Sequence, residues 1–245
     1  MPTGHAPSIL ATFGLSYQRL DTANPTDALA LRLLHRAAWC APVAIPRRLL
    51  LRAADLDPDD VDAQAEADAA LRRLAAVGLI EPLSDGALRL HHLLAAYARA
   101  RAADSTGDCA FVEQALVAES ADLHAGGSPQ VWQPCLDHLR FAVTRAEPRD
   151  DTTATLLTGL AVLLKTQRAY AEARSLLERA LAIRERVLGP EHSDTATGLN
   201  NIAVLLNTQG AYQGFAPQTT VDIRNEIAVR DMALECHAAR NESHF

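Results

Sequence analysis

LAVLLKTQRAY at 160–170 and IAVLLNTQGAY at 202–212 are two copies of one segment. The similarity covers nineteen residues, 152–170 against 194–212, and twelve of these aligned positions are identical. Copies that recur after forty-two residues are typical of helical repeat arrays, in which each unit buries its apolar face against the next. The sequence therefore predicts that this part of the chain is an α-solenoid.

The stretch between the copies, 171–188, is predicted to be the second helix of the repeat unit. Its apolar residues recur at spacings of three and four, so they share one helical face. These residues are Ala173, Leu176, Leu177, Ala180, Leu181 and Ile183. Gly189 and Pro190 follow, and a Gly with Pro just beyond it is a typical helix end.

The unit resembles the tetratricopeptide repeat in its forty-two-residue form, as found in kinesin light chains. The resemblance rests on Leu157, Leu160, Ala161, Tyr170, Ala173, Ala180 and Leu181, with GPEH at 189–192 and DTA at 194–196. It implies a scaffold that binds a protein or peptide partner and has no catalytic activity of its own.

The resemblance also places the binding groove on the first helices of the repeats. Related repeats use an Asn there to hold the backbone of a peptide, because an amide both donates and accepts hydrogen bonds. Asn200 and Asn201 occupy this place in the second copy, where the first copy has Thr158 and Gly159. Two interpretations of these amides stay open: they bind a peptide, or they make hydrogen bonds within the chain.

The composition narrows the classes of function. The chain is 49% apolar but only 4% aromatic, so its core is expected to consist of Leu, Ala and Val in packed helices. The sole lysine, Lys165, lies inside a first repeat helix, whereas a phosphate loop needs Gly-Lys-Ser/Thr after a strand. A net charge of −7 argues against non-specific nucleic-acid binding. We expect neither an enzyme nor a cofactor.

The cysteines and the N-terminus indicate a compartment. Four cysteines are scattered with no CxxC pair, which is typical of buried thiols in a reducing environment rather than of disulfides or a metal site. Residues 1–10 lack the basic and apolar segments of a secretory signal. No run reaches the roughly 18 apolar residues of a membrane helix. The sequence predicts a cytoplasmic protein with no metal and no membrane contact.

The N-terminal half shows the element order of a winged helix. Helices are predicted at 26–39, 47–54, 62–77 and 92–103, with an extended segment at 43–46. Gly78 is predicted to end the third helix. Strands are predicted at 79–83 and 87–91, joined by a hairpin turn at Ser84–Asp85–Gly86. The acidic run before the third helix is predicted to be its start, with Asp57 as N-cap.

LRLHHLLAAYARARA at 88–102 resembles the end of the winged-helix segment in NB-ARC-type (STAND) signalling NTPases of actinobacteria. The resemblance covers 12–103. Those proteins run from a nucleotide-binding module through a winged helix to a repeat sensor. The resemblance implies that this chain is the regulatory and sensor part of such a protein, without the nucleotide-binding domain, so that a separate NTPase module is a possible partner.

His91 is a candidate nucleotide sensor by this resemblance alone. In the family, a histidine at the end of the hairpin contacts the phosphate of bound ADP and is followed by Asp. Here the histidine is present, but His92 replaces the Asp. Because this chain lacks the nucleotide domain, a plain histidine at the hairpin end is the alternative.

The alternative function is a DNA-binding transcriptional regulator that uses the winged helix. Its recognition helix would be 62–77. The segment 55–68 has seven acidic residues and no basic one, and a phosphate-lined groove requires a basic helix. Nucleic acid is therefore not the expected partner.

The expected fold class is all-α with one small β-hairpin, a winged-helix domain followed by a helical-repeat α-solenoid. The expected organisation is a polar N-terminal segment at 1–25, a winged-helix-like domain at 26–103, a helical bridge at 104–150, one and a half repeat units at 151–212 and an irregular tail or capping helix at 213–245. The second unit lacks its second helix. Its apolar residues need a cover from the tail, a second copy of the chain or a partner, so self-association through this end is expected.

Overall fold

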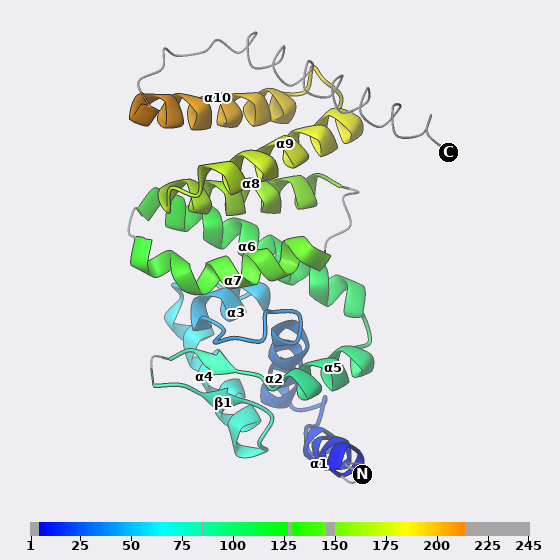
Figure 1. Ribbon diagram of the computed structural model, residues 1–245. Helices are drawn as coiled ribbons and strands as arrows, with labels where there is room; N and C mark the ends of the chain where they lie inside the picture. The colour runs from blue at the N-terminus through cyan, green and yellow to red at the C-terminus, as the bar shows by residue number, and fades with distance from the viewer. Residues whose placement is uncertain (1–4, 85, 127–128, 146–149, 214–245) are drawn as a thin grey trace, which may run out of the picture. The chain divides into compact units, whose positions relative to one another are not determined.

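The structure is a computed structural model that describes residues 5–84, 86–126, 129–145 and 150–213 (Figure 1). The chain divides into two compact units, Met1–Ala146 (unit 1) and Glu147–Phe245 (unit 2). In the described residues the structure is helical apart from one small two-stranded sheet. This confirms the prediction of an all-α chain with a single hairpin.

Unit 1 is built around one central helix. Its elements are α1 (His5–Gln18), α2 (Pro25–Ala37), α3 (Arg47–Ala53), α4 (Val61–Ala76), β1 (Glu81–Pro82), β2 (Leu88–Arg89), α5 (His92–Arg101), α6 (Ser105–Gly126) and α7 (Pro129–Arg145). Helix α2 contacts α3, α4, α5 and α6. The first predicted helix begins at residue 26, so α1 is a helix that the sequence pattern did not indicate.

The start of α4 differs from the prediction. Its N-cap is Asp60, whose Oδ1 accepts a hydrogen bond from the backbone N–H of Asp62 at 2.8 Å. Asp57 was expected in this role. The side chain of Asp57 instead accepts from the backbone N–H of Asp59 at 2.9 Å, which closes an Asx turn before the helix and leaves the capping to Asp60.

The hairpin is short and has a third extended partner. Strands β1 and β2 are antiparallel, with Glu81 opposite Arg89 and Pro82 opposite Leu88. Ile45 also pairs with Leu88, through backbone N···O distances of 2.8 and 3.0 Å. The strands are shorter than predicted, and one cause is Pro82, which has no N–H to donate to the ladder.

Helices α6 and α7, which were expected as a bridge, pack within unit 1. Helix α6 contacts α2, α3 and α7, and Arg52 of α3 forms an ion pair with Asp122 of α6. On α7, the buried His138 accepts from the backbone N–H of Ala41 at 3.0 Å, and its Nε2 lies 3.1 Å from the carbonyl oxygen of Ala44. These contacts hold the loop after α2.

Unit 2 contains α8 (Asp151–Thr166), α9 (Tyr170–Val187) and α10 (Ser193–Gln213). Helix α9 packs against both α8 and α10 (Figure 1). Ala161, Ala173 and Ala180 are buried, as a close approach of paired helices requires. Gly189 ends the second helix with a φ of +90°, a left-handed conformation that favours glycine. The predicted tail or capping helix at 213–245 lies outside the described residues, apart from Gln213 itself.

Candidate functional site

The candidate binding surface of unit 2 is the solvent-exposed stripe of α10. Its members recur at about one turn of helix: Ala196, Thr197, Asn200, Val204 and Asn207. The opposite face carries Leu199, Ile202 and Leu205, which are 4, 0 and 0% exposed. The alternation of apolar and polar positions thus turns one face of the helix inward and leaves the other exposed.

Asn200 lies on this stripe and Asn201 is half-buried beside it. Within residues 5–84, 86–126, 129–145 and 150–213, neither amide forms a hydrogen bond to another described residue. Each amide therefore has donors and an acceptor that no described residue occupies. Both interpretations of these amides remain predictions.

Thr158, the predicted counterpart on α8, has a different environment. It is half-buried, and its hydroxyl donates to the backbone oxygen of Ala154 at 2.9 Å. The hydroxyl can still accept a hydrogen bond from a ligand, but its proton is already used. Thr158 and the two asparagines lie on separate helices, and α9 contacts both of these helices.

A buried arginine fixes α8 against α9. Arg184 donates from Nε to Asp151 at 2.9 Å and from Nη2 to the hydroxyl of Thr155 at 3.1 Å. The residue is 6% exposed. A buried guanidinium with two such partners holds its helix at one angle and one register, because a shift would leave its donors unpaired. These two contacts tie the first turns of α8 to the last turns of α9.

His91 serves as the N-cap of α5. Its Nδ1 accepts from the backbone N–H of Leu93 at 3.2 Å, and its ring stacks on His92 with centroids 4.4 Å apart. The residue is exposed. Capping of α5 explains a histidine at this position without any nucleotide. Because Nδ1 is engaged in the cap, Nε2 is the ring nitrogen that could contact a ligand.

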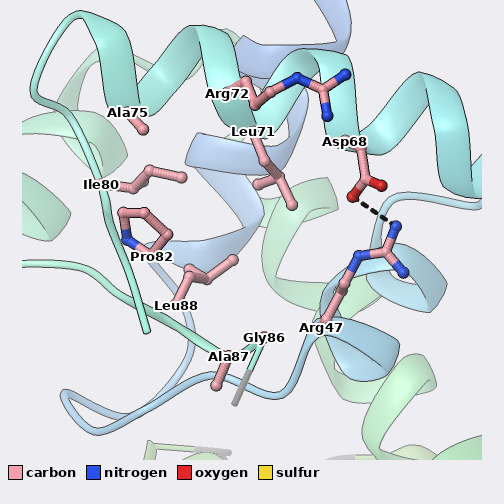
Figure 2. Close-up of a pocket in the computed structure, with 10 residues that line it drawn as sticks. All are labelled: Arg47, Asp68, Leu71, Arg72, Ala75, Ile80, Pro82, Gly86, Ala87 and Leu88. Carbon is pink, nitrogen blue, oxygen red and sulfur yellow. Dashed lines mark hydrogen bonds and ion pairs between the residues drawn. The ribbon is translucent and has the colours of Figure 1, made fainter. Parts of the chain in front are cut away.

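A pocket of about 210 Å³ lies between α4 and the hairpin in unit 1 (Figure 2). Figure 2 shows Leu71 of α4 pointing toward Ile80, Pro82 and Leu88 of the hairpin. At the rim, Arg47 donates to Asp68 at 2.7 Å. The walls of the pocket come from three separate segments, so no local pattern in the sequence indicates it.

The thiols that the structure describes in unit 1 have raised pKa values, which disfavours the reactive thiolate. Burial raises the pKa of both Cys40 and Cys135 to about 12 and that of Cys109 to about 11. A nucleophilic cysteine requires the opposite shift.

In the part of the chain that the structure describes, no group of three or more His, Cys, Asp or Glu residues is placed to hold a metal ion. None of the helices described is long and apolar enough to cross a membrane.

Comparison with known families finds that residues 153–194 match the tetratricopeptide repeat. The match begins in α8, includes all of α9 and ends at the second residue of α10. No curated protein matches the chain. The predicted repeat is confirmed, and the chain therefore carries a module of the class that mediates protein–protein interactions.

Proposed function

We propose that this chain is the regulatory and sensor part of a STAND-type signalling protein, a protein-interaction scaffold that acts with a separate nucleotide-binding module. The observation that carries the proposal is the combination of two parts in one chain. A tetratricopeptide repeat at 153–194 follows a unit in which a helix, an extended residue, two helices and a hairpin come in winged-helix order.

The contacts within unit 1 support the winged-helix interpretation. Ile45 pairs with Leu88 and so adds a third extended segment to the hairpin. Arg73 of α4 forms an ion pair with Asp27 of α2 at 2.8 Å, which links the would-be recognition helix to the central helix. The hairpin and α4, the would-be recognition helix, are therefore tied to α2 and to the segment that follows it.

The surface of α4 favours a protein partner over DNA. Asp62 and Glu66 are exposed on it. Three nearby guanidinium groups are already paired with carboxylates: Arg47 with Asp68, Arg48 with Asp59 and Arg73 with Asp27. Such pairs have little positive charge left for phosphates, on which DNA binding depends.

The described cysteines support a proposal for the compartment. The cysteines that the structure describes, Cys40, Cys109 and Cys135, are free thiols. Thiols persist where glutathione and thioredoxin keep them reduced. We therefore propose that the protein acts in the cytoplasm.

The test begins with the coding sequence that flanks this chain. A module with a Gly-Lys-Ser/Thr phosphate loop, encoded in frame or by the adjacent gene, is expected there. The purified module, loaded with ADP, should release it more slowly when this chain is added. His91→Asn keeps the N-cap of α5, since Asn is also a good N-cap, and should abolish the slowing, whereas the neighbouring His92→Asn should retain it.

Two outcomes would refute the proposal. One is the absence of any such module near the coding sequence. The other is an ADP release rate that this chain does not change, or that His91→Asn and His92→Asn change equally.

A further inference from the structure

Arg99 and Arg145 of unit 1 are half-buried, but unlike the other buried or half-buried arginines of this unit they have no carboxylate partner among the described residues. Among the described residues of this unit, those with a carboxylate partner are Arg36, Arg47, Arg48, Arg52 and Arg73. Arg99 lies on α5 and Arg145 on α7. Their positive charges are thus uncompensated in the described part of the unit.

Both guanidinium groups lie over the ring of Trp39, which follows α2. The Cζ atoms of Arg99 and Arg145 are 5.5 and 4.9 Å from the centroid of this ring. Arg145 also lies 4.4 Å from the ring centroid of Phe141. Arg99 donates from Nη1 to the carbonyl oxygen of Ala38. Aromatic faces attract cations, and these contacts hold the two guanidinium groups close to one indole.

The cluster has donors without acceptors. The Nε1 of Trp39 and the Nε and Nη2 of Arg145 are buried and have no hydrogen-bond partner among the described residues. Burial lowers the pKa of Arg99, and the nearby charge of Arg145 lowers it further. Buried donors and like charges are both unfavourable unless an acceptor of negative charge joins them.

We propose that Trp39, Arg99 and Arg145 form a binding site for a phosphate-sized dianion. Two guanidinium groups match the charge of a dianion, and their N–H groups suit the oxygens of a phosphate. The indole N–H supplies one more donor. Each of the three residues is half-buried, whereas the donor atoms without partners are themselves buried.

Trp39 itself reports on the site. The sequence has two tryptophans, Trp39 and Trp132, so the emission of a Trp132→Phe protein comes from Trp39 alone. This protein is titrated with inorganic phosphate at pH 7.5, and separately with acetate and with chloride, all at one ionic strength. Phosphate should change the emission in a saturable way, and the two monoanions should not.

Charge variants in the same Trp132→Phe background locate the ion. Arg99→Gln and Arg145→Gln should each weaken phosphate binding at least about tenfold, because each removes a charge-assisted contact. Arg101→Gln removes the same charge from the same helix, at an exposed residue whose Cζ lies 5.1 Å from the ring of Tyr97. It should bind phosphate as the parent protein does. Circular dichroism spectra verify that each variant is folded.

Two results would overturn the proposal. The first is an equal response to phosphate, acetate and chloride. The second is undiminished phosphate binding in folded Arg99→Gln and Arg145→Gln.

Discussion

Gly198 of α10 lies against Leu181 of α9, so closely that a Cβ atom on Gly198 would stand 3.3 Å from the Cδ1 of Leu181. The aligned residue of the first copy is Leu156, which is buried in α8. The two copies are thus not equivalent at this position. In the second copy, the missing side chain allows α10 to pack closely on the second helix of the repeat.

The first prediction follows from this contact. Gly198→Leu restores the residue of the first copy but forces a large side chain into a filled space. The cost of overpacking exceeds the gain in helix propensity, so the free energy of unfolding should fall by about 2 kcal/mol. Urea unfolding measures it. Ala196→Leu on the exposed stripe is the control and should change stability by less than about 0.5 kcal/mol. Equal stability of the two variants would contradict the packing described.

The second prediction concerns pH. His138 is 1% exposed, and burial lowers its pKa, as it does that of His35. An unfolded chain takes up protons at the usual histidine pKa of about 6.5, whereas the folded chain does so only at lower pH. Between the lowered pKa of the folded chain and about 6.5, the unfolded state therefore binds more protons than the folded state. The free energy of unfolding should consequently fall as the pH drops below about 6.5.

His138→Gln separates this histidine from the others. The variant should be less stable than the native chain at pH 7.5, because the backbone N–H of Ala41 loses the Nδ1 acceptor. Its melting temperature should also fall less between pH 7.5 and 5.5. A loss across this range that matches that of the native chain would show that His138 does not titrate as inferred.

Local chemistry made much of the fold predictable. The forty-two-residue repeat was visible as sequence identity, and the helix ends at Gly78 and Gly189 were marked by residues that tolerate φ values of +73° and +90°. Gly86 in the predicted two-strand turn has a φ of +81°. Each of these features depends on a few neighbouring residues, which a sequence shows directly.

Features that depend on distant residues were not predictable. Helix α1 contains Gly14 and exposes Leu15, so it has little amphipathic pattern. Tertiary contacts of Tyr17 hold it, a hydrogen bond of 2.8 Å to His35 and an edge-on ring contact with Tyr97. The pocket beside α4 and the cluster around Trp39 likewise join side chains from separate elements, and no local spacing pairs them.

The third prediction is that the chain does not retard duplex DNA near physiological salt. The exposed acids of α4 and the ion pairs of Arg47 and Arg73 leave this described surface little free positive charge for the phosphates of the groove. An electrophoretic mobility assay with excess non-specific competitor measures this. A retarded band that survives the competitor would favour a transcriptional regulator instead.

The fourth prediction is that the purified chain neither binds nor hydrolyses ATP. It has no phosphate loop, and His91 already caps α5. Equilibrium dialysis with labelled ATP and a phosphate-release assay test both statements. Saturable binding at micromolar ATP would contradict the prediction, and its loss in His91→Asn but not in His92→Asn would assign the site.

The most direct test of the central claim, that α10 of the repeat binds a partner segment, is the affinity of a peptide selected against the whole chain from a display library. Fluorescence anisotropy compares the native chain, the double variant Asn200→Ala/Asn201→Ala, and Arg179→Ala on the exposed face of α9 as control. Each amide contributes hydrogen bonds worth about 1 kcal/mol, so the double variant should bind about tenfold or more weakly while Arg179→Ala binds as the native chain does. Unchanged affinity in the double variant, or an equal loss in Arg179→Ala, would contradict the account.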